Sequence, residues 1–143
     1  GKSMGDISGN AQYDAARANW GGNWRMPTKA EMHELIYKCT WEWMTQNDVK
    51  GCKVTGPNGN SIFRPAAGYR NGSSLNNAGS DGRYWSSAPC EDSDYRAYYL
   101  FFGSDKLRMP HLNRYIGLSV RPVEKKRSVF NLFNSFDLFP HGI

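Results

Sequence analysis

The strongest structural pattern in the chain lies in residues 25–39, RMPTKAEMHELIYKC. Thr28 and Glu31 have the spacing of a capping box, in which each side chain accepts a hydrogen bond from the other residue's backbone N–H. A helix is therefore expected to begin after Thr28. Apolar residues then recur at helical spacing on one face, at Met32, Leu35, Ile36 and Cys39. The segment predicts an amphipathic helix.

Three further elements are predicted on either side of this helix. Alanine-rich sequence before the paired glycines Gly21 and Gly22 favours a short helix. Alternation of apolar and polar residues after Cys39 indicates a half-buried strand. Asn58-Gly59 supplies the positive φ angles that a tight hairpin turn needs. The predicted elements are a helix over 11–19, a strand over 40–44 and a hairpin of 53–55 with 61–63.

The second half of the chain is expected to be rich in loops. Residues 68–83 contain many Gly, Asn and Ser residues and predict a long ordered loop, whereas residues 84–87 resume an extended pattern. Residues 89–96 are polar and predict another loop. A final strand is expected over 118–122, at an edge or ending there, because proline cannot donate to a strand ladder.

Residues 97–102 form a strongly aromatic strand whose two faces can be assigned from its period of two. Tyr98, Leu100 and Phe102 share one face, and Ala97, Tyr99 and Phe101 share the other. Two interpretations remain open at this level. Tyr99 and Phe101 point into solvent as part of a recognition surface with Arg and Tyr neighbours, or the strand is buried on both faces.

Composition favours one globular domain and disfavours several classes of protein. The chain has 143 residues, a net charge of +5 and 14% aromatic residues. The mean hydropathy is −0.68, and no run of about 18 apolar residues is present, so no membrane insertion is expected. Lys125, Lys126 and Arg127 form the one tight basic run without a nucleic-acid-binding motif, so no nucleic-acid partner is expected.

The sequence carries none of the common catalytic or metal-binding motifs, so no catalytic residue, metal ligand or cofactor is expected. The three histidines are scattered. Glu91, Asp92 and Asp94 predict a solvated acidic loop, with a calcium site as the open alternative. Cys39 is expected to be a buried structural thiol, and a redox pair with Cys52 is the alternative.

Six segments in order resemble one known family, the Fibrobacter succinogenes major paralogous domain, which is common in gut Bacteroidetes. The resemblance covers roughly residues 6–123. The segments are Asp6–Asn10, Asn19–Thr28, Gly59–Phe63, Pro65–Arg70, Tyr84–Ser87 and Gly117–Val123.

The resemblance implies an α+β, C-type-lectin-like fold with two helices packed on short irregular antiparallel sheets with long loops. It implies a domain over residues 1–123 and leaves residues 124–143 as a tail of unknown role. It also implies a cell-surface or extracellular location and a protein or cell-surface ligand. The polar start Gly1-Lys2-Ser3 is not expected to be part of a signal peptide, and removal of a natural leader is the open alternative.

The chain further resembles the variable proteins of diversity-generating retroelements, in which a reverse transcriptase rewrites adenines in a segment that here spans about 83–123. This resemblance implies a non-enzymatic binding face in which Tyr99 and Phe101 lie off the core, and it explains the odd cysteine as a product of chance. The implied ligand-binding residues are Arg83, Cys90, Tyr95, Arg96, Tyr99, Phe101, Gly103, His111, Leu112, Asn113, Tyr115 and Ile116.

Two rival functions are compatible with the same fold. One is a fixed adhesin or structural surface module without a diversified face. The other is an enzyme related to the formylglycine-generating enzymes, which need a reactive cysteine pair. A thiol of low pKa at Cys39 or Cys52 would favour the enzyme.

Overall fold

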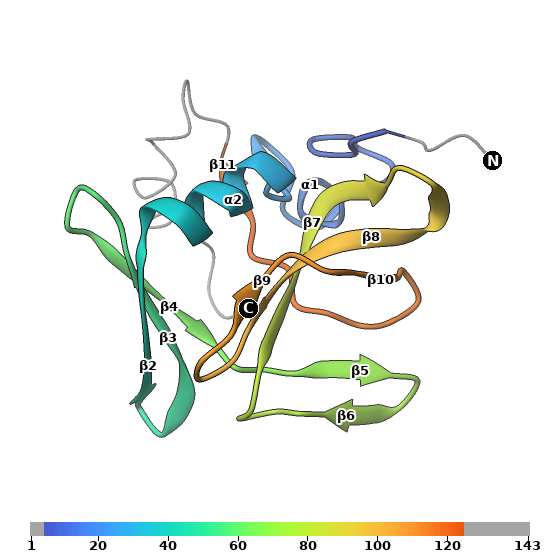
Figure 1. Cartoon of the computed structure of the whole chain (residues 1–143). Coiled ribbons are helices and arrows are strands. Elements are labelled where there is room, and N and C mark those ends of the chain that lie inside the picture. The colour runs from blue at the N-terminus through green and yellow to red at the C-terminus, as the bar shows by residue number, and fades with distance from the viewer. Residues whose placement is uncertain (1–4, 125–143) are drawn as a thin grey trace.

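The computed structural model describes residues 5–124, which form an α+β fold of two helices and mostly antiparallel strands in small sheets (Figure 1). The helices are α1 (Ala15–Trp20) and α2 (Lys29–Lys38). The strands are β1 (Trp24–Arg25), β2 (Thr40–Gln46), β3 (Val49–Thr55), β4 (Ser61–Pro65), β5 (Tyr69–Asn71), β6 (Ser74–Asn76), β7 (Gly82–Cys90), β8 (Ser93–Phe102), β9 (Leu107–Arg108), β10 (His111–Asn113) and β11 (Val123–Glu124).

The predicted capping box at the start of α2 is confirmed. The Glu31 backbone N–H donates to Thr28 Oγ1 at 3.1 Å, and the Thr28 N–H donates to Glu31 Oε1 at 3.0 Å. Arg25 adds a two-pronged ion pair, with Nη2 2.9 Å from Glu31 Oε2. Burial raises the pKa of Glu31, but the hydrogen bonds from Arg25 and Thr28 outweigh burial and hold the pKa below its usual value.

The first helix is shorter than predicted, because it begins at Ala15 and not at residue 11. Asp14 is the N-cap, and its carboxylate accepts the Arg17 N–H at 3.0 Å. The same buried carboxylate accepts the backbone N–H groups of Gly9 and Met26, at 2.6 and 2.8 Å. Asp14 therefore holds three segments together. Because these hydrogen bonds fix Asp14 as the N-cap, the helix begins later than the alanine content predicts.

The predicted strand over 40–44 and the hairpin of 53–55 with 61–63 are both confirmed, within a longer three-stranded sheet in the order β2-β3-β4. The sequence reading missed the β2–β3 hairpin. Its turn residues Asn47 and Asp48 both have positive φ angles, of 50° and 65°. Asn and Asp tolerate that conformation better than other non-glycine residues.

The two predicted loops are largely wrong. β5 and β6 form a hairpin inside 68–83, and β7 begins at Gly82. β7 and β8 extend to Cys90 and from Ser93, so the connection within 89–96 is only two residues long. Both segments pair through polar residues, so they lack the alternation of apolar and polar residues that predicts a strand. The strand predicted over 118–122 is wrong, because this segment has one isolated bridge, between Ser119 and Tyr84, and the chain pairs next through β11 with β1.

Helix α2 joins two hydrophobic clusters, and it lies across the sheets in Figure 1. Leu35 packs with the β3–β4 side in one cluster, and Met32 packs with Tyr84, Leu100 and Phe102 in the other. Gly82 lies against the Phe102 ring so closely that a β-carbon there would overlap the ring. The core therefore occupies the helix side of β7 and β8 and leaves the opposite side of this hairpin for other contacts.

No helix within residues 5–124 has the length and apolar character needed to cross a membrane. The predicted tail beyond Glu124 and the basic run Lys125–Arg127 lie outside the described residues.

Replacing Glu31 by Gln is expected to lower the free energy of unfolding by about 3 kcal/mol at pH 7, because Arg25 then loses a buried ionic partner. Since the folded-state pKa of Glu31 is lowered, its contribution is present above the unfolded pKa of about 4.3 and disappears as the pH falls through the folded value. Urea unfolding at several pH values measures this. Glu34→Gln is the control, because its partly exposed i,i+4 pair with Lys38 contributes about 0.5 kcal/mol or less. Equal losses for the two variants would contradict the assignment.

Candidate functional site

A groove of about 530 Å³ lies between the start of β8 and the turn that follows β10. It contains Tyr95 and Arg96 on one side and Asn113 and Tyr115 on the other. Strand pairing sets Asn113 opposite Arg96, and the Arg114 N–H donates to the Tyr95 carbonyl at 2.9 Å. Tyr95 and Tyr115 are 81% and 74% exposed, so two large aromatic side chains flank the groove without support from the core.

A second group of side chains stacks on the face of β7 and β8 opposite the core. The Arg83 guanidinium lies 4.1 Å from the Tyr69 ring centroid and 5.2 Å from that of Phe101. Arg108 lies 4.9 Å from the Phe101 centroid on the neighbouring strand β9. Asp81 pairs with Arg83 at 3.1 Å. The cations are thus held in fixed orientations against aromatic rings.

The tip of the β7–β8 hairpin carries a third group of polar contacts. Tyr98 donates its hydroxyl hydrogen to Glu91, which raises the pKa of Tyr98 and lowers that of Glu91. Lys29 lies 3.6 Å from the centre of the Tyr98 ring, and His111 packs edge-on against it. Two members of the predicted acidic loop have protein partners here, because Asp92 also accepts a hydrogen bond from the Cys90 thiol.

The structure divides the predicted ligand-binding residues into three groups by exposure. Tyr95, Arg96, His111 and Tyr115 are exposed. A second set is partly exposed, namely Arg83, Phe101, Gly103, Leu112 and Asn113. Cys90, Tyr99 and Ile116 are buried, at 4%, 6% and 7% exposure.

The expectation that Tyr99 points into solvent is therefore wrong, although its assignment to the face opposite Leu100 and Phe102 is confirmed. Trp85 lies directly opposite Tyr99 across the hairpin and packs edge-on against it, with ring centroids 5.9 Å apart. Burial raises the pKa of Tyr99 above its usual value, although the positive charges of Arg83 and Arg108 act to lower it. Large neighbours on the same face thus cover this ring.

Cys90 and Ile116 are the other two predicted face residues that the structure buries. Cys90 closes the β7–β8 ladder opposite Ser93. Ile116 ends the turn after β10, where its N–H donates to the Asn113 carbonyl, and its apolar side chain is turned away from solvent. Exposure at these positions depends on strand ends and turns, which the alternation pattern does not describe.

Sequence reasoning missed Tyr69 and Arg108 as members of the stacked group. Tyr69 lies in the segment expected to be a loop, and Arg108 lies in the two-residue strand β9. Phe101 lies opposite both Arg83 and Arg108 because β8 pairs with β7 on one side and with β9 on the other. No local pattern in the sequence indicates it.

Two of the thiols are poor nucleophiles at neutral pH. Burial raises the pKa of Cys39 to about 11, with a further rise from the nearby Glu34 carboxylate. Burial alone raises the pKa of Cys52 to about 11. Within residues 5–124 no three His, Cys, Asp or Glu side chains gather in a way that would hold a metal ion.

Comparison of the chain with protein-family models, curated proteins and solved structures gives no match.

In a Cys90→Ser background, iodoacetamide is expected to react with native Cys39 and Cys52 on the order of 100-fold more slowly at pH 8 than with the unfolded chain. The raised pKa values keep both thiols protonated. The rate should rise about tenfold per pH unit up to pH 10. A mass-spectrometric time course measures both rates. A fast reaction that levels off below pH 8 would instead favour the formylglycine-generating type of enzyme.

Proposed function

We propose that this chain is a non-enzymatic recognition domain with a C-type-lectin-like fold, which binds a protein or cell-surface ligand through a diversified face. The face is centred on the groove between Tyr95 and Tyr115, and the domain works at the cell surface or outside the cell. The observation that carries the proposal is the pair of exposed tyrosines, at 81% and 74% exposure, beside an arginine and an asparagine in one groove.

The chemistry of this groove suits recognition. Tyrosine offers a large contact area and a polar hydroxyl at a low cost in conformational entropy, and it is enriched at binding interfaces with arginine. Neither Tyr95 nor Tyr115 belongs to the hydrophobic clusters of the described residues. Their replacement would therefore change the surface without opening a cavity.

The difference in burial between the two ends of β8 supports diversification. Leu100 and Phe102 are fully buried and would keep the fold, whereas Tyr95 and Arg96 at the start of the same strand are exposed. A reverse transcriptase that rewrites adenines can then change the exposed positions at little cost in stability. The proposed contact set consists of the exposed and partly exposed residues, with Tyr95, Arg96, His111 and Tyr115 at its centre.

Sequencing the DNA around the gene tests the diversification directly. We expect a near-copy of the segment that codes for residues 83–123, with a reverse transcriptase gene beside it. Mismatches between the two copies should fall only at template adenines and change the codons of the exposed residues. Absence of both the copy and the reverse transcriptase gene would leave a fixed adhesin or structural module of the same fold.

Randomising Tyr95, Arg96 and Tyr115 together is expected to leave most variants folded, because exposed positions usually change the free energy of unfolding by less than about 0.5 kcal/mol each. A matched library at Tyr99 and Ile116 should lose most folded members, since truncating a buried aromatic residue costs about 3 kcal/mol. Protease resistance of the displayed libraries measures the folded fraction. Equal losses in the two libraries would show that the tyrosine pair is structural.

A further inference from the structure

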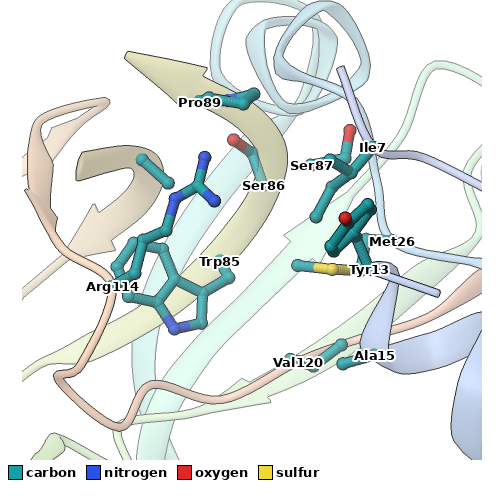
Figure 2. Close-up of a pocket in the computed structure, with 11 residues that line it drawn as sticks. Ile7, Tyr13, Ala15, Met26, Trp85, Ser86, Ser87, Pro89, Arg114 and Val120 are labelled. Carbon is teal, nitrogen blue, oxygen red and sulfur yellow. The ribbon is translucent and has the colours of Figure 1, made fainter. Parts of the chain in front are cut away.

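The outer face of β7 and β8, opposite the hydrophobic core, differs in character between its two ends. At one end lies a cavity of about 260 Å³, which Figure 2 shows with Trp85 and Arg114 on one side and Ile7 and Met26 on the other. Arg114 is the one residue of this lining that is charged at neutral pH, and it already takes part in an interaction within the protein. The charged group with unused hydrogen-bonding capacity lies at the other end of the face.

At that other end, aromatic rings and arginines alternate in one row across four strands. The row starts with Tyr69 on β5, whose ring centroid lies 4.1 Å from the guanidinium of Arg83 on β7. The Arg83 guanidinium lies 5.2 Å from the ring centroid of Phe101 on β8, and the guanidinium of Arg108 on β9 lies 4.9 Å from it. Strand pairing sets Phe101 directly opposite both arginines, so its ring lies between the two cations. The order of the row is therefore ring, cation, ring, cation.

The two arginines of this row differ in how their charges are balanced. Asp81 accepts hydrogen bonds from Arg83 Nε at 3.1 Å and from Nη2 at 3.4 Å. No carboxylate within residues 5–124 forms an ion pair with Arg108, and this includes Asp105 in the turn before β9. Arg108 is exposed, and stacking on the Phe101 ring uses a face of the guanidinium and leaves the N–H donors at its edge available. The row thus ends at an oriented cation whose charge is not balanced.

The charges around β9 differ from those around β10. The stretch of chain over 106–114 contains no acidic residue. At its β10 end Asp92 supplies a negative charge, because a hydrogen bond from the Cys90 thiol and the positive charges of His111 and Arg96 lower the pKa of Asp92. The β9 end has no such carboxylate partner among the described residues. The positive charge on this strand is therefore strongest at β9.

We propose that the β9 end of the row is an interaction surface for an acidic segment of a protein partner, which places a Glu or Asp carboxylate on the outer N–H groups of Arg108. The planar guanidinium matches a carboxylate with two parallel hydrogen bonds. Because the Phe101 ring already orients this side chain, binding costs less side-chain entropy. Arginine beside aromatic surface is typical of protein–protein interfaces, which favours a protein over a glycan or a lipid surface.

This surface extends the proposed recognition face to β9, so the identity of its partner rests on the proposed function. Arg108 does not belong to the predicted ligand-binding residues, and the surface does not require that the face be diversified. If the gene is diversified but no binding depends on Arg108, the recognition face stands and this surface fails. If Arg108 binds acidic peptide but the gene lacks a template copy, this surface stands and diversification fails.

Two capped peptides test the surface in NMR titrations of the full chain at low ionic strength. They are acetyl-Tyr-Glu-Glu-amide and its neutral counterpart acetyl-Tyr-Gln-Gln-amide. We expect the acidic peptide to bind about fivefold more tightly, because an exposed ion pair is worth up to about 1 kcal/mol. The preference should shrink when salt is added. The Nε–H resonance of Arg108, assigned from an Arg108→Gln spectrum, should shift on titration. Equal affinity for the two peptides, or binding of neither, would overturn the proposal.

Three variants locate the effect. Arg108→Gln should lower the affinity for the acidic peptide to that for the neutral one. Arg70→Gln removes another exposed arginine, on β5, and should leave both affinities unchanged. Phe101→Leu keeps every charge but removes the ring that orients Arg108. It should weaken binding of the acidic peptide and remove the ring-current shift of the Arg108 Nε–H resonance in the free protein.

Two results from these variants would refute the assignment. If Arg70→Gln weakens binding of the acidic peptide as much as Arg108→Gln does, the attraction is one of general charge. If a sulfated hexasaccharide binds in a way that depends on Arg108 while the acidic peptide does not bind, the surface recognises a glycan and not a protein.

Discussion

The contact between Glu31, Arg25 and Thr28 determines how the rest of the chain is arranged. One carboxylate accepts from the Arg25 guanidinium and from the Thr28 N–H, so a single side chain fixes both the first turn of α2 and the strand that leads into it. With the helix start fixed, Met32 and Leu35 point into the two hydrophobic clusters. The helix thereby connects the β2–β4 sheet to the β7–β8 hairpin. A second carboxylate, Asp14, ties the N-terminal segment to the same region through Gly9 and Met26.

The hydrophobic core lies on the helix side of β7 and β8. On the other side of this hairpin, the residues that cover the strands differ from one end to the other. At one end the N-terminal segment covers part of Trp85 and leaves a cavity whose rim, at Tyr13 and Ala15, is exposed. At the other end Arg83 and Phe101 stack with side chains from β5 and β9. Tyr99 lies between the two ends and is covered by its neighbours. The second face of this hairpin thus has a buried middle at Tyr99 and partly exposed side chains toward both ends.

The features that were predictable from the sequence depend on residues close together in the chain. The capping box of Thr28 and Glu31 and the hairpin around Asn58-Gly59 each involve a few consecutive residues, and both are confirmed, although within this pair only Gly59 has a positive φ angle, of 83°. The β5–β6 hairpin was missed because its paired residues, such as Asn71 and Ser74, are polar and leave no alternation. The exposure of Tyr99 was mispredicted because the period of two assigns a residue to a face without saying what covers that face. Trp85 covers it through a register that becomes known only from the fold.

In the candidate site the backbone is rigid and the side chains are exposed, so the two properties belong to different parts of the same residues. The backbone under the groove is fixed by the β8–β10 pairing and by the Arg114–Tyr95 hydrogen bond, whereas the side chains of Tyr95 and Tyr115 extend from it with little support. Exchange of these side chains leaves every one of those backbone hydrogen bonds in place. Around the cavity beneath the N-terminal segment, hydrogen bonds of Asp14 and Ser87 fix the backbone, while Tyr13 and Ala15 at its rim are exposed. Under the proposed recognition function, the surface of the groove allows its side chains to change while the backbone beneath them stays the same.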